Sequence, residues 1–254
     1  MANGIRHAPV GGVDNPSFPV SKSEWEDDHA GGVVAGSSTI IIPGLAASPD
    51  IKPGSPNGQD DEFETTDTSD PMTGWTTLGA PTVHNMNSTA LSHYYVEKAA
   101  AAGVAIEGIY KAVPGFPYTV TTKITDTVVL RLDFIRGGQL MLLETGPGRI
   151  WACGPLFDGG ARVAVVAYTS RTVFSSVIAQ LNAGAVELRP PYYLRAVCAD
   201  ATHVDFQVSH GGLIWYSIAG NQTLPFTSAF HGLSIDAEQA TYAAKAAFDY
   251  FRVT

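Results

Sequence analysis

From about residue 60 onward, short apolar or alternating segments follow one another, separated by turn signals. In residues 118–124, Tyr-Thr-Val-Thr-Thr-Lys-Ile, apolar and polar side chains nearly alternate, which predicts a strand with one dry and one solvated face. Similar segments, rich in β-branched and aromatic residues, predict further strands. The expected strands are 104–112, 118–126, 128–133, 139–144, 150–154, 162–168, 192–199, 204–209 and 214–219. Strands of this kind belong to antiparallel sheets stacked face to face, so we predict an all-β sandwich.

Two alanine-rich segments, 97–102 and 236–247, depart from this pattern. Helix propensity alone would make both helical. Because their flanks are extended, we predict a turn between strands for the first and a loop leading into a final strand, 248–253, for the second.

The first part of the chain lacks the alternation and differs in charge. Residues 1–75 carry twelve Asp or Glu against three Lys or Arg, whereas residues 76–254 carry twelve of each. Frequent prolines and glycines interrupt any long element in the first part. We therefore predict an extended N-terminal arm and linker, 1–59, followed by one compact domain, 60–254.

Two short stretches of the arm have the character of docking segments. Residues 23–29 predict a helix of one or two turns. A helix this short is not stable alone, so it would order only when docked on a partner chain or on the domain. The alternative is that the segment before the domain is disordered. Residues 39–42, Thr-Ile-Ile-Ile, could pair with an edge strand or with their copies in an oligomer. The candidate anchors of the arm are Phe18, Trp25, Ile40, Ile41 and Ile42.

Composition argues against several classes of partner. The net charge is −9 and no Lys/Arg cluster occurs, so we expect no nucleic-acid binding. No apolar run approaches the roughly 20 residues of a membrane span, and the first residues do not resemble a secretory signal, so we expect no membrane insertion. Cys153 and Cys198 lie in apolar or alternating stretches, which favours buried, reduced thiols over a single disulfide.

Residues suited to nucleophilic catalysis are few. No Gly-x-Ser-x-Gly turn occurs. Ser209-His210 and His203-x-Asp205 combine suitable residue types, but Ser209 and His210, as neighbours on a strand, point to opposite faces, and we interpret all four as surface polar residues.

Paired carboxylates are not evident either. Asp126, Asp133 and Glu144 could meet in the fold, yet they stand at strand ends beside arginines, which favours structural or rim roles. We therefore predict that the protein is not an enzyme and assign no catalytic residue.

No cofactor or metal is expected. Residues 146–149, Gly-Pro-Gly-Arg, provide a turn rather than a phosphate loop. The acidic cluster that begins at Asp60-Asp61-Glu62 could collect calcium, but Thr65 stands where a calcium loop needs glycine, so a solvated acidic loop is favoured. Aromatic residues, including Trp75, Trp151, Trp215, Tyr94, Tyr95, Tyr192, Tyr193 and Tyr216, are numerous enough for sugar-stacking platforms. Aromatic residues on strands are more often part of the core, so no glycan-binding residue is assigned.

Several motifs of the domain occur together in a known superfamily. They are Tyr193-Leu194-Arg195, the stretch 204–215 (Val-Asp-Phe-Gln-Val-Ser-His-Gly-Gly-Leu-Ile-Trp), Gly232-Leu233 and the stretch 248–253 (Phe-Asp-Tyr-Phe-Arg-Val). They resemble the second half of a concanavalin A-like jelly-roll domain, and Asp61-x-Phe63 with Trp75 resembles its opening. The resemblance covers about residues 60–254 and implies a jelly-roll sandwich, a fold shared by lectins, glycosidases and structural modules.

The arm has a resemblance of its own. Residues 15–29, Asn-Pro-Ser-Phe-Pro-Val-Ser-Lys-Ser-Glu-Trp-Glu-Asp-Asp-His, resemble the amino-terminal stretches of tailed-bacteriophage fibre and other virion proteins. This resemblance implies a virion subunit, assembled in the host cytoplasm, whose arm contacts other virion proteins while the jelly roll projects outward.

The expected function is host attachment by a fibre, spike or decoration protein. A homo-oligomer, for example a trimer, would bring the runs at 40–42 together and strengthen weak contacts with host surface glycans. The alternatives are a glycan-cleaving depolymerase on the same fold and a capsid decoration protein without a ligand.

Overall fold

In the computed structural model of the protein, the chain divides into two units, residues 1–55 and 56–254. The structure describes residues 59–63, 73–81, 83–86, 93–100, 103–128, 133–146, 148–158, 160–182, 190–237 and 243–254. The proposed anchors Phe18, Trp25, Ile40, Ile41 and Ile42 lie outside these ranges, so the arm stays a prediction.

The described residues form fourteen strands and no helix. The strands are β1 (Thr76–Leu78), β2 (Val83–Met86), β3 (Tyr94–Lys98), β4 (Glu107–Ala112), β5 (Tyr118–Val128), β6 (Asp133–Leu143), β7 (Ile150–Asp158), β8 (Ala161–Ser170), β9 (Val173–Asn182), β10 (Tyr192–Cys198), β11 (His203–Ser209), β12 (Tyr216–Thr223), β13 (Phe230–Ala237) and β14 (Ala244–Val253).

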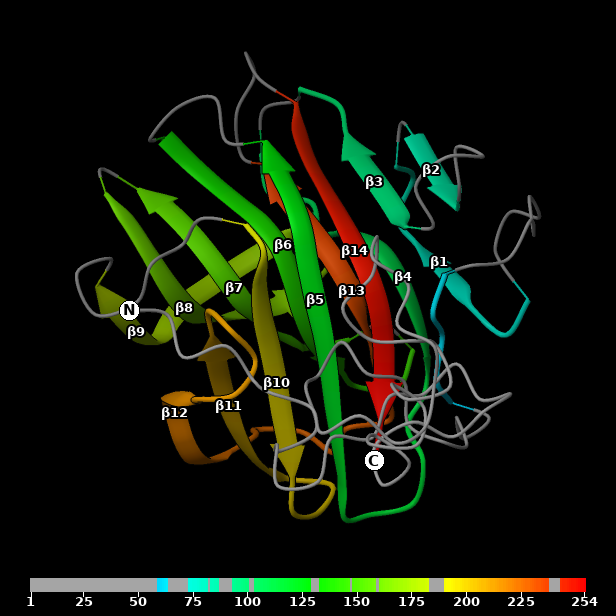
Figure 1. Ribbon diagram of the computed structural model, residues 1–254, viewed down its shortest axis with the longest axis vertical. Coiled ribbons are helices and arrows are strands. Elements are labelled where there is room, and N and C mark those ends of the chain that lie inside the picture. The colour runs from blue at the N-terminus through cyan, green and yellow to red at the C-terminus, as the bar shows by residue number, and fades with distance from the viewer. Residues whose placement is uncertain are drawn as a thin grey trace, which may run out of the picture. The chain divides into compact units, whose positions relative to one another are not determined.

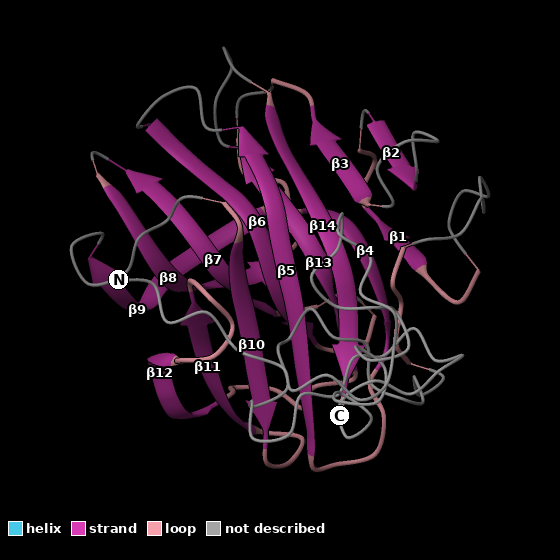
Figure 2. Cartoon of the chain, viewed as in Figure 1, coloured by secondary structure: helices cyan, strands magenta, loops and turns pink. Residues whose placement is uncertain are grey.

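These strands build two antiparallel sheets of seven strands each (Figures 1 and 2). The first sheet has the order β12-β11-β10-β5-β14-β3-β2, and the second has the order β1-β4-β13-β6-β7-β8-β9. The chain crosses between the sheets repeatedly, as between β5 and β6. The predicted all-β jelly-roll sandwich is confirmed.

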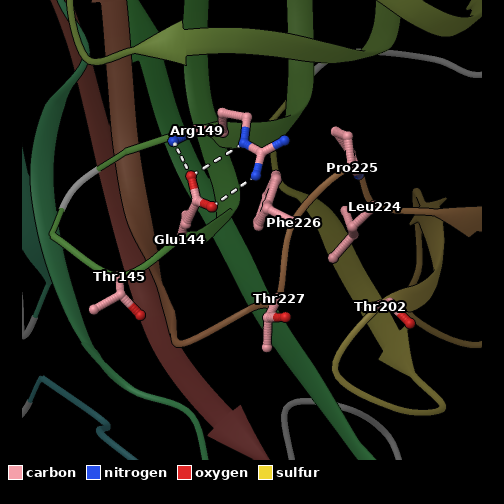
Figure 3. Close-up of a pocket in the computed structure, with 8 residues that line it drawn as sticks. All are labelled: Glu144, Thr145, Arg149, Thr202, Leu224, Pro225, Phe226 and Thr227. Atoms are coloured by element: carbon pink, nitrogen blue, oxygen red, sulfur yellow. Dashed lines mark hydrogen bonds and ion pairs between the residues drawn. The ribbon is translucent and has the colours of Figure 1, made fainter.

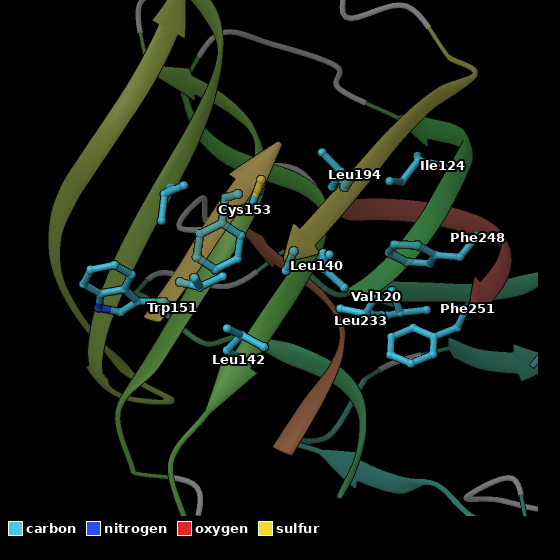
Figure 4. Packing of buried hydrophobic residues seen from close by; sticks show 14 of the residues in the cluster. Val120, Ile124, Leu140, Leu142, Trp151, Cys153, Leu194, Leu233, Phe248 and Phe251 are labelled. Atoms are coloured by element: carbon cyan, nitrogen blue, oxygen red, sulfur yellow. The ribbon is translucent and has the colours of Figure 1, made fainter. Parts of the chain in front are cut away.

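The main hydrophobic core fills the space between the sheets. Val120 and Ile124 on β5 point inward because alternate residues of a strand share a face, and Leu140 and Leu142 on β6 lie in the same core (Figure 4). All four side chains are fully buried. Burial of each stabilises the fold by about 1.5–3 kcal/mol, so this alternation is the main link between sequence and fold.

A second hydrophobic cluster lies on the other face of the second sheet. Met141 and Leu143, which alternate on β6 with residues of the main core, belong to it. This face is buried because the sheet curls: the backbone N–H of Ile106, just before β4, donates to the carbonyl of Arg171, between β8 and β9, at 3.0 Å. In a flat sheet β4 and β8 would lie about 19 Å apart. The concave face is therefore filled with apolar side chains.

A group of buried charged side chains lies near the end of β13 in this curled sheet. Asp236 is fully buried and accepts hydrogen bonds from the backbone of Ala105 and from the hydroxyl of Tyr168, both at 3.2 Å. The ammonium of Lys98 lies 3.9 Å from the same carboxylate. Burial raises the pKa of the neighbouring Glu107, against the lowering effect of Lys98. The contacts of Asp236 join segments far apart in sequence, which gives it a structural role.

The observed strands differ from the expected ones in several places. Of the strand expected at 128–133, residues 129–132 lie outside the described residues; Val128 is the last residue of β5 and Asp133 is the first residue of β6. The turn expected at 97–102 begins inside β3, and the segment 236–247 contains the end of β13 and the start of β14. Strands β1, β2, β3, β9 and β13 are not among the expected ones.

The described acidic residues, Asp60, Asp61 and Glu62, are half-buried and bonded to the sheet, which differs from the solvated loop expected. The Glu62 carboxylate forms a fork with the guanidinium of Arg252, at 2.6 and 2.9 Å. The Asp60 carboxylate accepts the backbone N–H of Val253 at 2.7 Å. These carboxylates fasten the start of the domain to β14, near the middle of the first sheet.

Asp61 continues this attachment. Its backbone N–H and carbonyl both bond to Phe251 at 2.7 Å, and its carboxylate accepts the indole N–H of Trp75, also at 2.7 Å. Trp75 is thereby held against the Phe251 ring, with centroids 5.0 Å apart.

The expected state of the cysteines is confirmed. Cys153 and Cys198 are both unpaired and buried. Burial raises the pKa of both thiols, that of Cys198 to about 11, so both stay protonated and inert at neutral pH.

Candidate functional site

A pocket of about 530 Å³ opens among three connections at one end of the sandwich (Figure 3). One wall is the β6–β7 turn, and the others come from the β10–β11 and β12–β13 connections. The lining residues are Glu144, Thr145, Arg149, Thr202, Leu224, Pro225, Phe226 and Thr227.

The β6–β7 turn holds its wall of the pocket in a fixed shape. The predicted turn at 146–149 is confirmed, since β6 ends just before it and β7 begins just after it. Gly146 has a φ of +70°, which glycine adopts without strain. A Cβ on Gly148 would lie 2.6 Å from Oε2 of Glu144. The missing side chain therefore leaves room for the Glu144 carboxylate.

Glu144 and Arg149 form a two-point ion pair inside this turn. Nη2 of Arg149 donates to Oε1 of Glu144 at 2.7 Å, and Nε donates to Oε2 at 3.1 Å. The backbone N–H of Arg149 also donates to Oε2, at 3.2 Å. These hydrogen bonds lower the pKa of Glu144 to about 2, so the carboxylate stays ionised across the physiological pH range.

The opposite wall combines an aromatic ring with hydroxyl groups. The centroid of the Phe226 ring, which is mostly buried in the main core, lies 5.7 Å from the Arg149 guanidinium carbon. Thr202 donates its backbone N–H to Asp200 at 2.7 Å and its hydroxyl at 2.8 Å, and the hydroxyl oxygen lies 3.2 Å from Nδ1 of His203. Thr227 adds an exposed side chain.

This arrangement suits reversible binding of a polar ligand. Paired charges, threonine hydroxyls and apolar walls converge, which is the mixture that a hydroxyl-rich molecule requires. Glu144 is a poor general acid, because its proton is lost at low pH and Arg149 occupies both carboxylate oxygens.

The residues considered for nucleophilic catalysis do not form such a site. Nδ1 of His203 lies 2.8 Å from the Asp200 carboxylate. Ser209 is buried, not on the surface as expected, and its hydroxyl accepts the backbone N–H of Gly212 at 2.8 Å. His210 is exposed.

Of the three carboxylates weighed for an acid pair, Asp126 and Glu144 lie far apart, and the side chain of Asp133 lies outside the described part of the structure. Asp126 is near the end of β5, beside the connection into β6, whereas Glu144 follows the far end of β6. The eleven residues of β6 span about 36 Å. These two carboxylates therefore cannot act on one bond.

Most of the aromatic residues are core, as expected. Trp75, Trp151 and Tyr193 are at most 6% exposed. Trp215 is half-buried and Tyr216 is 47% exposed, so these two reach the surface.

The ranges that the structure describes contain no group of three or more His, Cys, Asp or Glu placed to hold a metal ion. Within the same ranges, no helix has the length and hydropathy to span a membrane.

Sequence reasoning missed the second wall of the pocket. The one sequence feature that points to this wall is Pro225, which indicates a connection between strands. Nothing in the local sequence indicates that Thr202 and Phe226 lie opposite a turn some fifty residues or more earlier in the chain.

No family model and no curated protein matches the chain. Among solved structures, the GH43 protein BlXynB of Bacillus licheniformis is similar with a TM-score of 0.60 and 14% identity, over 81% of this chain and 41% of that one. A xylan β-1,4-xylosidase of Bacillus halodurans has a TM-score of 0.53 and 14% identity, over 84% and 41%. A protein of unknown function from Saccharomyces cerevisiae has a TM-score of 0.53 and 17% identity, over 72% and 96%. The chain spans about two-fifths of the length of the two Bacillus proteins.

These similarities correct the prediction that the protein is not an enzyme. Chains that share this fold include a xylosidase, so the jelly roll gives no ground for excluding catalysis. At such low identity the likeness establishes the fold, and activity has to be argued from the site itself.

Proposed function

We propose that the chain is a subunit of a tailed-phage appendage that binds glycans of the host surface. The observation that carries the binding part is the pocket, where the Glu144–Arg149 ion pair, threonine hydroxyls and the Phe226 ring converge. A saccharide offers hydroxyls to the polar groups and C–H faces to the apolar wall.

The attachment part of the proposal rests on the arm. Residues 15–29 resemble virion amino termini, and residues 40–42 form a β-branched run suited to pairing between copies. The arm would contact other virion proteins, and several copies in an oligomer would turn weak glycan contacts into firm adhesion. Its place of action would be the virion.

Glycan cleavage is the second candidate, favoured by the fold shared with a xylosidase. Measuring both binding and the release of reducing ends on the same polysaccharide distinguishes a glycan-binding protein from a hydrolase.

The pocket is tested with immobilised bacterial O-antigen and capsular polysaccharides. We expect the wild-type protein to bind at least one of them, and Arg149→Met to bind it about tenfold more weakly, because a hydrogen bond to a charged group is worth about 1.5–3 kcal/mol. Arg162→Met is the matched control, since Arg162 makes an exposed hydrogen bond to Gln180 on β9, away from the pocket lining. Binding of none of the polysaccharides would refute glycan recognition, and release of reducing ends would identify the protein as a hydrolase.

The arm is tested by deleting residues 1–57. We expect a folded jelly roll that still binds glycan but is absent from purified phage particles when it replaces the full chain. Incorporation of the truncated protein at the wild-type level would refute attachment through the arm. Loss of the folded state would show that the arm belongs to the core.

A further inference from the structure

The outer face of the first sheet carries a row of polar side chains that the pocket does not use. On β11, Asp205 accepts hydrogen bonds from the hydroxyl of Ser217 on β12 at 2.7 Å and from the amide of Gln207 at 2.6 Å. The amide oxygen of Gln207 accepts Nε of Arg195 on β10 at 2.8 Å, and Nη2 of the same guanidinium donates to it as well. The row fixes the orientation of each member.

Arg195 supports an aromatic ring. Its guanidinium carbon lies 4.0 Å from the centroid of the Trp215 ring, which is a close cation–π contact. Because the hydrogen bonds to Gln207 fix the position of the guanidinium, the Trp215 ring packs against a group that is held in place. The Trp215 side chain is half-buried, so part of it is open to solvent.

The connection that presents Trp215 is itself anchored and apolar. The buried hydroxyl of Ser209 accepts the backbone N–H of Gly212, and Gly212 has a φ of +72°. Leu213 and Ile214 are 57% and 69% exposed. With Tyr216 they make up three of the five large hydrophobic side chains that are exposed among the described residues, so exposed apolar surface is concentrated beside Trp215.

We propose that Trp215, Arg195, Gln207, Asp205 and Ser217 form a second saccharide-binding site, which takes a neutral pyranose ring stacked on Trp215. An aromatic face next to carboxylate, amide and hydroxyl groups matches a sugar, which has an apolar C–H face bordered by hydroxyls. A second copy of the chain docking here would have to desolvate Asp205 and Arg195, which is costly without matching partners.

The two sites lie toward opposite ends of β11. Thr202 of the pocket precedes this strand, whereas Trp215 stands next to Tyr216, which pairs with Val208 near the other end, so Trp215 lies about 20 Å along the sheet from Thr202. The inference rests on the proposed function and narrows its ligand, because an oligosaccharide can reach both sites whereas a monosaccharide cannot. Simultaneous contact would raise the affinity through effective concentration.

The experiment uses the full chain and glucose, galactose and mannose oligosaccharides of one to six units. For the longest probe bound, calorimetry is expected to show Trp215→Ala at least tenfold weaker than wild type and Trp215→Phe within about threefold, because phenylalanine keeps a stacking face. Leu213→Ala is the control on the same connection and should leave affinity unchanged. The wild-type indole fluorescence should shift on titration, and this shift should be lost in Trp215→Ala.

Four other results are informative about the second site. Equal affinity of Trp215→Ala and wild type, with Arg149→Met weakened, overturns the second site and leaves the pocket standing. Binding of no probe by wild type overturns the second site as stated, and the proposed function is then judged separately by the bacterial polysaccharides. If Trp215→Ala changes the sedimentation mass, the surface is an interface between copies. If Trp215→Ala does not fold, Arg195→Met is measured instead, because this variant removes the guanidinium against which the Trp215 ring packs.

Discussion

Replacing Phe251 by alanine is expected to lower the free energy of unfolding by about 3–5 kcal/mol. The Phe251 side chain is fully buried, and its ring lies 5.0 Å from that of Trp75 and 4.9 Å from that of His231. Its backbone also pairs with Asp61. The truncation would leave a cavity where the start of the domain meets β14, and urea denaturation followed by fluorescence measures the loss.

Val173→Thr is the control for this variant. Val173 is 50% exposed on β9, and threonine keeps the β-branched shape, so stability should change by no more than about 0.5 kcal/mol. A loss below about 1 kcal/mol for Phe251→Ala would mean that the interior collapses around the vacancy and that this cluster is not tightly packed.

Acidification is expected to destabilise the protein through His231 before most carboxylates titrate. Burial, together with the smaller effect of the nearby Lys111 charge, lowers the pKa of this fully buried histidine to about 3. Neither ring nitrogen has a hydrogen-bond partner among the described residues. Between about pH 6.5 and 3 the unfolded chain binds a proton that the folded chain does not, so stability falls by up to about 1.4 kcal/mol per pH unit.

His231→Phe isolates this effect. The ring sits between the aromatic rings of Tyr118 and Phe251, at 5.4 and 4.9 Å, so phenylalanine suits the site. We expect the difference in unfolding free energy between variant and wild type to grow steadily from pH 6.5 to pH 4. Carboxylates common to both proteins cancel in this difference. Parallel stability curves would show that His231 titrates in the folded state near its ordinary pKa.

Sequence could predict strands that alternate or end at clear turns, such as the stretch 118–126. It did not predict β13, where His231, Gly232 and Ser234 interrupt the apolar residues. Yet β13 is paired with β4 and β6 on its two sides. A Cβ on Gly232 would lie 2.1 Å from the carbonyl oxygen of Ile109. Glycine is needed there because two backbones approach closely, and that requirement is visible only in three dimensions.

The same limit applies to the candidate sites. The turn that joins Glu144 to Arg149 is local, and the sequence predicts it. The other wall of the pocket and the stack of Trp215 on Arg195 depend on strand register and on which connections meet. These are set by the whole sheet, so no short segment contains the information.

The hydrogen bond between Asp60 and the backbone of Val253 makes the two ends of the jelly roll immediate neighbours. Such a domain can be inserted into a surface loop of another protein without distorting that protein, because the two ends of the inserted domain lie close together. It also lends itself to circular permutation: a few residues joining 60 to 253 would allow the chain to be reopened at a tip far from both proposed sugar sites, leaving them intact.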